Sequence, residues 1–282
     1  MPLENIRDWI GKSQRVEDLI APWPARALAA TLDEADPNPK NGDILPPLWH
    51  WLYFHEATLQ SKLGPDGHAE RGEFLPPVPL PRRMWAGSRF RFDGPPLRIG
   101  ETATRKSEIK SVEAKTGSTG AMVFVTVEHT LSSPRGTAFV EEHDIVYREA
   151  AKPGEAARPP KPAPGDATWS KNIMADPVLL FRYSALTFNG HRIHYDHPYV
   201  TGAEGYPGLI VHGPLLGTLQ IELARRSNPH RTPATFEFRA LSPVFAGSFF
   251  TVGARHEADD SITTWIAAPA GGLAQQGKVT FQ

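Results

Sequence analysis

The sequence contains no cysteine, which excludes several kinds of functional site at once. Without thiols there is no disulfide, no cysteine nucleophile, no zinc knuckle and no iron–sulfur cluster. An excess of charge of one sign is also missing, because 30 lysines and arginines balance 31 aspartates and glutamates to a formal net charge of -1. Such a balance gives no overall field for DNA, RNA or an anionic membrane. We therefore expect neither a nucleic-acid partner nor a membrane partner.

Long hydrophobic runs are absent as well. No stretch approaches the ~20 consecutive apolar residues that span a bilayer. The N-terminus, Met-Pro-Leu-Glu-Asn-Ile-Arg, lacks the basic region and apolar run of a signal peptide. We therefore expect a soluble, cytoplasmic protein. Two common enzyme signatures, the Gly-x-Ser-x-Gly elbow and the Gly-x-Gly-x-x-Gly dinucleotide turn, do not occur either.

Proline and glycine are plentiful, with 28 and 24 residues among 282, which favours strands joined by turns and long loops. The length suggests two domains at roughly 150 residues each. Residues 150–166 include five prolines and no large apolar side chain, a composition typical of an extended spacer. We predict a linker there, between units at 1–149 and 167–282. A long surface loop inside one domain is the alternative.

An internal repeat favours the linker. Residues 89–100 and 235–247 both read Phe-x-Phe, then proline, then glycine. Each opens a series of segments with the period-two alternation of half-buried antiparallel strands. The predicted strands include 122–131, 137–147, 249–254, 261–267 and 274–281. A helix precedes each series: residues 213–226 have apolar side chains at helical spacing, and residues 47–54 are apolar almost all round. The predicted class is α+β, with two antiparallel sheets, each wrapped around a central helix.

Two motifs in the second half carry the clearest chemistry. Residues 186–196 read Leu-Thr-Phe-Asn-Gly-His-Arg-Ile-His-Tyr-Asp, and residues 206–215 read Tyr-Pro-Gly-Leu-Ile-Val-His-Gly-Pro-Leu. This pair resembles the hydratase motif of MaoC-like and R-specific enoyl-CoA hydratases. That motif runs Leu-Ser/Thr-Gly-Asp-x-Asn-Pro-x-His-x-Asp, followed after a loop by Ile/Val-His-Gly-Met/Pro-Leu. The first motif is similar to that of the branch that includes mesaconyl- and itaconyl-type CoA hydratases and 3-hydroxyacyl thioester dehydratases.

The resemblance implies a tandem, or double, hot dog fold with a degenerate N-terminal unit and a catalytic C-terminal unit. It implies a hydro-lyase that reversibly adds water, in syn fashion, to a 2-enoyl-CoA, without a cofactor. A short branched dicarboxylic acyl-CoA such as mesaconyl- or itaconyl-CoA is the preferred substrate. The alternatives are a 3-hydroxyacyl-carrier-protein dehydratase, a thioesterase and a non-catalytic acyl-CoA-binding protein. Two fused units are compatible with a monomer or a homodimer.

The motif also implies roles for four residues. His194 is the candidate acid/base, since imidazole titrates near working pH. The backbone N–H of Gly213, at the start of a helix, suits a developing oxyanion. His212 supports that loop. Asn189 stands where the family pattern has aspartate; an amide cannot accept a proton, so we assign it to positioning water. A turn-forming role for Asn189 and a structural role for His194 remain open from the residues alone.

Basic and aromatic residues near the motif are candidates for binding the substrate. Arg192 offers a bidentate donor for a carboxylate or phosphate, and Tyr206 opens the second motif. Arg82 and Arg83 lie in a long first-half loop that can cover the same cleft. For each arginine an exposed surface role is the alternative.

A metal interpretation rests on the spacing of three histidines. His191, His194 and His197 recur at three-residue steps, which on a helix would share one face. Gly190 and Pro198 oppose a regular helix over this stretch. We therefore expect no metal.

Overall fold

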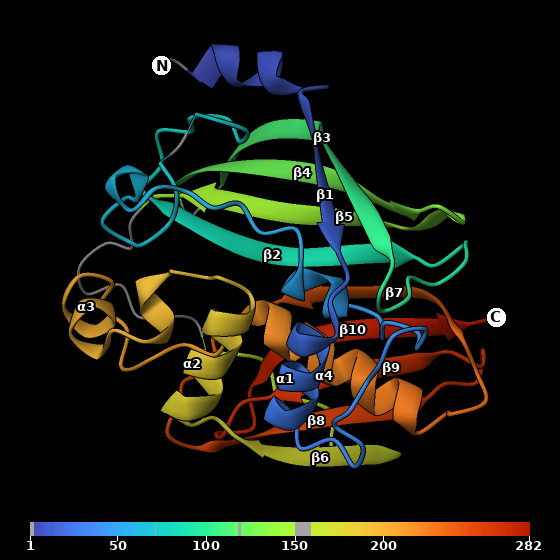
Figure 1. Ribbon diagram of the computed structural model, residues 1–282. Helices are drawn as coiled ribbons and strands as arrows, with labels where there is room; N and C mark the ends of the chain where they lie inside the picture. The colour runs from blue at the N-terminus through green and yellow to red at the C-terminus, as the bar shows by residue number, and fades with distance from the viewer. Residues whose placement is uncertain (1–2, 71, 118–119, 150–158) are drawn as a thin grey trace.

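The computed structural model describes residues 3–70, 72–117, 120–149 and 159–282. Its strands form one antiparallel sheet in the order β1-β3-β4-β5-β2-β7-β10-β9-β8-β6 (Figure 1). The strands are β1 (Ser13–Leu19), β2 (Arg82–Arg91), β3 (Thr102–Gly117), β4 (Gly120–Ser133), β5 (Gly136–Arg148), β6 (Trp169–Met174), β7 (Pro233–Ala240), β8 (Phe249–His256), β9 (Ile262–Ala267) and β10 (Leu273–Phe281). All the strands predicted from alternation are present.

The α-helices lie mainly on the half of the sheet formed by β6–β10. They are α1 (Pro22–Thr31), α2 (Pro177–Leu186), α3 (His197–Gly202) and α4 (Gly213–Arg226), with 3₁₀ helices at Leu3–Trp9, Trp49–Leu52, Gln60–Lys62 and Arg192–His194. Helix α4 packs across β7–β10, and α1 and α2 pack together on its outer side (Figure 1). In the described parts of the chain, no helix is long and apolar enough to cross a membrane.

The two predicted sheets are the halves of one continuous sheet. Strand β2 pairs with β5 on one side and with β7 on the other, and Phe90 lies opposite Phe236 at the junction. Because β2 and β7 are the two Phe-x-Phe segments of the repeat, their apolar faces merge at this edge. The two halves of the chain therefore share a core rather than packing as separate bodies.

The predicted helix at residues 47–54 is wrong in length and type, since only Trp49–Leu52 is helical and it is a 3₁₀ helix. Leu48 and Phe54 adopt positive φ angles of 70° and 61°, which interrupt a right-handed helix on both sides. Among the described residues, the sheet half formed by β1–β5 therefore wraps no long helix, and the expectation that each sheet surrounds a central helix holds only for α4. Residues 47–54 are apolar because this short turn is inserted between the two halves of the chain.

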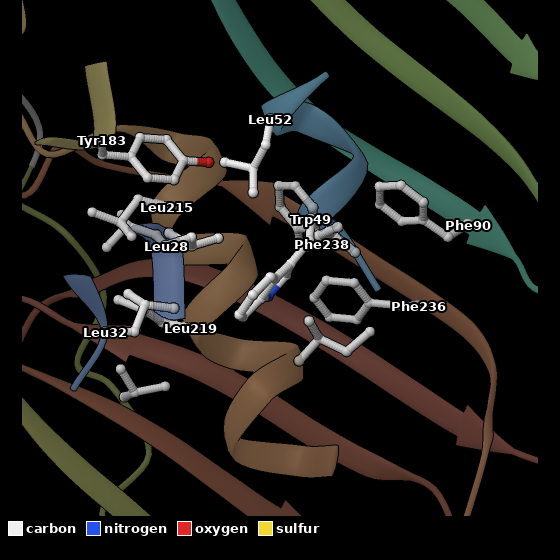
Figure 2. Packing of buried hydrophobic residues seen from close by; sticks show 14 of the residues in the cluster. Leu28, Leu32, Trp49, Leu52, Phe90, Tyr183, Leu215, Leu219, Phe236 and Phe238 are labelled. Carbon is white, nitrogen blue, oxygen red and sulfur yellow. The ribbon is translucent and has the colours of Figure 1, made fainter. Parts of the chain in front are cut away.

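One hydrophobic core joins segments from both halves of the chain (Figure 2). It contains side chains from α1, the 3₁₀ helix Trp49–Leu52, α2, α4 and the paired strands β2 and β7, among them Leu28, Leu32, Trp49, Leu52, Phe90, Tyr183, Leu215, Leu219, Phe236 and Phe238. The indole Nε1 of Trp49 donates to Oε1 of buried Glu222 on α4 at 3.1 Å. Burial of these large side chains stabilises the relative position of the halves.

A buried glutamate organises the polar interior of the N-terminal half. Glu141 is 1% exposed. It accepts hydrogen bonds from Ser88 Oγ at 3.0 Å and Trp51 Nε1 at 3.3 Å, and it lies 3.0 Å from His50 Nε2. Burial alone would raise the pKa of Glu141, but hydrogen bonds from His143 and His50 hold it well below its usual value. The carboxylate is therefore ionised and fully partnered.

We expect Glu141→Ala to lower the free energy of unfolding by about 3–5 kcal/mol, because it leaves several buried donors without their acceptor. Glu141→Gln keeps the shape and one acceptor oxygen, so its loss should be smaller. Urea unfolding followed by circular dichroism measures both. A loss below about 1 kcal/mol in the alanine variant contradicts this role.

The predicted linker is described only in part. Residues 150–158 lie outside the described residues. Within 159–166 most residues are exposed, and Pro162 forms an isolated bridge with Gly272. The division into units at 1–149 and 167–282 remains our proposal.

Candidate active site

The segment that carries the first motif begins where α2 ends. Phe188 follows the helix with a positive φ of 48° and donates its N–H to the carbonyl of Ala185 at 3.4 Å. The N–H of Asn189 donates to the carbonyl of Ser184 at 2.8 Å. This pair of bonds is a Schellman motif with phenylalanine in the position that glycine usually takes. The helix end therefore fixes where Asn189 enters the site.

The side chain of Asn189 participates in the turn that follows. Its Oδ1 accepts the backbone N–H of His191 at 3.0 Å. The amide oxygen thereby fixes the path of the chain toward His194, as the turn-forming interpretation expects. A role for Asn189 in positioning water stays a prediction.

His194 lies in the 3₁₀ helix Arg192–His194 and is 7% exposed. Its Nδ1 is 2.7 Å from the carbonyl oxygen of Ile210. Because a carbonyl only accepts, Nδ1 carries the proton and Nε2 of the neutral ring is left as the acceptor. The imidazole stacks on that of His212 with ring centroids 3.6 Å apart. His194 therefore presents a basic nitrogen in a fixed orientation.

Burial lowers the pKa of His194 to about 4, although the hydrogen bond to Ile210 acts in the opposite direction and His68 lowers it further. The pKa of His212 lies well below its usual value, chiefly because of burial and then because of the nearby charges of His194 and His191. Both rings are therefore neutral at pH 7. A neutral imidazole can accept a proton from water, as a hydratase requires.

His212 ends the loop before α4 and is fully buried. Its Nε2 is 2.8 Å from Ser184 Oγ. The next residue, Gly213, begins α4, so its N–H has no acceptor within the helix. A Cβ on Gly213 would lie 3.2 Å from the ring of Trp85 on β2. The start of α4 therefore lies against Trp85 of the N-terminal half.

The two predicted substrate-binding residues have clear positions. The guanidinium of Arg192 contacts Oδ2 of Asp196 at 2.7 Å, donates to the carbonyl of Pro65 at 2.9 Å and lies 4.1 Å from the ring centre of Tyr199. Its contacts stabilise the loop, and substrate binding by Arg192 stays a prediction. Tyr206 is half-buried beneath the guanidinium of Arg82, 5.6 Å from its ring centre.

The histidine series does not form one ligand set. His197 is exposed in the first turn of α3, away from the cluster that His191 joins. Among the described residues, the group with ligand atoms within 4.8 Å of one another consists of Asp66, His68 and His191. The sequence analysis missed Asp66 and His68, which come from the loop after the 3₁₀ helix Gln60–Lys62. Only the fold brings them to the motif.

Comparisons with known proteins fit this geometry. The family model described as hydroxyacyl-thioester dehydratase type 2 matches residues 48–246. The chain belongs to this family. The hydro-lyase class and the thioester substrate predicted from the sequence are thereby confirmed.

Relatives of this dehydratase family support the same conclusion. The chain is 47% identical to mesaconyl-C(4)-CoA hydratase of Chloroflexus aurantiacus over 251 residues, which cover 89% of each chain. It is 31% identical over 224 residues to the mitochondrial hydroxyacyl-thioester dehydratase type 2 of Schizosaccharomyces pombe, covering 71% of this chain and 74% of that one.

Solved structures confirm the predicted α+β double hot dog fold. A MaoC-like dehydratase from Phytophthora capsici superposes with a TM-score of 0.66 at 13% identity, covering 100% of this chain and 99% of that one. A Mycobacterium tuberculosis protein described as having a double hot dog fold superposes with a TM-score of 0.58 at 14% identity, covering 96% of each chain.

Proposed function

We propose that this hydro-lyase adds water to the double bond of mesaconyl-C4-CoA, a short branched dicarboxylic enoyl thioester. The observation that carries the proposal is the 47% identity to a mesaconyl-C(4)-CoA hydratase over nearly the whole chain. The site geometry supports it, because the neutral ring of His194 stacks on that of His212, the residue before the helix N–H of Gly213.

In the proposed reaction Nε2 of His194 takes a proton from water while the water oxygen bonds to the β-carbon. The π electrons of the double bond move toward the thioester carbonyl, and the oxyanion is stabilised by the N–H of Gly213. A proton is then delivered to the α-carbon, which completes the net addition of one water. His212 supports the loop, and Asn189 orients the water.

A purified enzyme with mesaconyl-C4-CoA, mesaconyl-C1-CoA, itaconyl-CoA and crotonyl-CoA in parallel tests this proposal. We expect loss of the enoyl-thioester absorbance without release of free CoA, fastest with the C4 isomer. The C1 isomer is a matched control, because it has the same atoms with the thioester at the other carboxyl. Release of CoA, or crotonyl-CoA as the fastest substrate, contradicts the proposal.

A second candidate is the dehydration of a 3-hydroxyacyl thioester, favoured by the name of the Schizosaccharomyces pombe relative, a hydroxyacyl-thioester dehydratase. It uses the same chemistry in reverse on an unbranched chain. Comparing 3-hydroxybutyryl-CoA with the same acyl group on acyl carrier protein distinguishes it. A preference of tenfold or more for the carrier protein, by the ratio kcat/KM, favours this second candidate.

A further inference from the structure

A loop from the N-terminal half packs directly on the catalytic motif. The backbone N–H of Arg192 donates to the carbonyl of Asp66 at 2.9 Å. Gly67 has a φ of +87°, and a Cβ there would lie 2.0 Å from the carbonyl oxygen of Gly190. Only glycine allows the two loops to approach this closely. The loop therefore has a fixed position beside the motif.

This approach places an aspartate–histidine pair next to the histidines of the site. Oδ2 of Asp66 accepts a hydrogen bond from Nδ1 of His68 at 2.9 Å, and Oδ1 accepts the backbone N–H of His68 at 3.0 Å. The ring of His68 lies 4.1 Å from that of His191, whose ring lies 5.5 Å from that of His194. With Nδ1 committed to the carboxylate, Nε2 is the nitrogen of His68 that exchanges a proton.

The charges around the pair favour proton transfer over metal binding. Burial alone would raise the pKa of Asp66, but its hydrogen bonds with His68 and the charge of that ring hold it below its usual value. Both oxygens of the ionised carboxylate are already used by His68. The positive charge of Arg83 acts on His191 in the same cluster, which disfavours a divalent cation.

The cleft beside the pair gives it access to solvent. Asp66, His68, Arg82 and Arg83 line an open cleft of about 590 Å³ together with Tyr199 and other residues. A proton lost from His68 can therefore be replaced from water. Arg82 and Arg83 bring positive charge to this cleft, which Asp66, Glu70 and Glu204 also line.

The reaction needs a proton donor for the α-carbon, and neither neutral His194 nor Asn189 supplies that proton at the start of the reaction. Hydration removes one proton from water and delivers another to the α-carbon. Neutral His194 can accept the first proton and can donate at Nε2 only by passing that same proton on, and an amide cannot exchange one. If the proton delivered to the α-carbon is not the one that His194 took from water, a second acid/base group must supply it.

We propose that His68, oriented by Asp66, is this second group and donates the proton to the α-carbon. This inference rests on the proposed hydration. As the imidazolium of His68 gives up its Nε2 proton, a C–H bond forms at the α-carbon from the electron pair of the enolate, and the thioester carbonyl is restored. The proton that His194 took from water leaves to solvent, and solvent reprotonates His68. Asp66 is a positioning residue that stabilises the positive charge on His68.

The test is the pH dependence of kcat/KM for mesaconyl-C4-CoA in four enzymes: the wild type, His68→Gln, Asp66→Asn and the control His197→Gln. We expect His68→Gln to lower kcat about 10²-fold or more, to change KM less than about threefold, and to abolish the alkaline limb. Asp66→Asn should move the alkaline limb to lower pH, since the imidazolium loses its anion. Exposed His197 should have no effect. Thermal melting shows that each variant folds.

Several outcomes overturn the inference. If His68→Gln keeps kcat within about threefold of wild type and retains the alkaline limb, while His194→Gln is inactive, the proposed function stands and the role of His68 falls. If His68→Gln does not fold, an unchanged alkaline limb in Asp66→Asn has the same meaning. Loss of wild-type activity on chelation, restored by zinc, makes the cluster a metal site. A wild type inactive on all four enoyl-CoAs contradicts the proposed function itself, and the inference with it.

Discussion

His194→Gln is expected to lower kcat for enoyl-CoA hydration by about 10²- to 10⁴-fold, the usual contribution of a positioned acid/base. The substitution removes the basic Nε2 that the hydrogen bond from Nδ1 to Ile210 holds in place. Because glutamine fills a similar volume, binding of the thioester should change little, and KM should stay within about threefold. Steady-state rates with mesaconyl-C4-CoA measure both constants.

The matched control for this prediction is His256→Gln, an exposed histidine on β8 that contacts Asp260 at 3.0 Å. Its rate should equal that of the wild type. On the acid side of the wild-type profile, kcat/KM should decline near pH 4, where His194 takes up a proton. A His194→Gln variant that keeps more than a tenth of wild-type kcat assigns the base to another residue.

Local patterns in the sequence predicted helix α4 and strands in both halves of the fold. Helix α4 has proline near its start and apolar residues at helical spacing, and the alternating strands β4, β5, β8, β9 and β10 are all present. The alternation pattern did not predict strands β1 and β3, because they carry few apolar side chains. β1 is mostly exposed along the edge of the sheet, and β3 alternates around charged residues. Period-two alternation reports burial, and an edge strand with little burial gives a weak pattern.

The prediction of the site had the same strengths and limits. His194, His212 and Gly213 lie in contiguous motifs, so sequence spacing reveals them, and the stacked imidazoles show that the two motifs meet. Asp66 and His68 lie more than a hundred residues earlier, in a loop with no periodic pattern. Their relation to His191 depends on pairing of β2 with β7 and on the close approach of Gly67 to Gly190. Such long-range contacts are set by the fold and leave no local signal.

The buried histidines also predict that the protein loses stability on mild acidification. The pKa of His194 is lowered to about 4 and that of His212 lies well below its usual value, in each case mainly because of burial. In the unfolded chain both titrate near 6.5. Between these values the unfolded chain binds protons that the folded protein does not, so the free energy of unfolding rises with pH and is lost as the pH falls.

Each such histidine contributes up to about 1.4 kcal/mol per pH unit, so His194 and His212 together remove roughly 2–3 kcal/mol per unit below pH 6. Urea unfolding at pH 7.5, 6.5, 5.5 and 5.0 measures this slope. This range lies above the ordinary pKa of carboxyl groups, so buried Glu141, whose stabilising charge is lost only as the pH falls further, does not contribute. His194→Gln should reduce the slope, whereas His256→Gln should not. An unfolding free energy that stays constant from pH 6.5 to 5.0 means that the folded protein takes up protons as the unfolded chain does, which contradicts the lowered pKa of His194 and of His212.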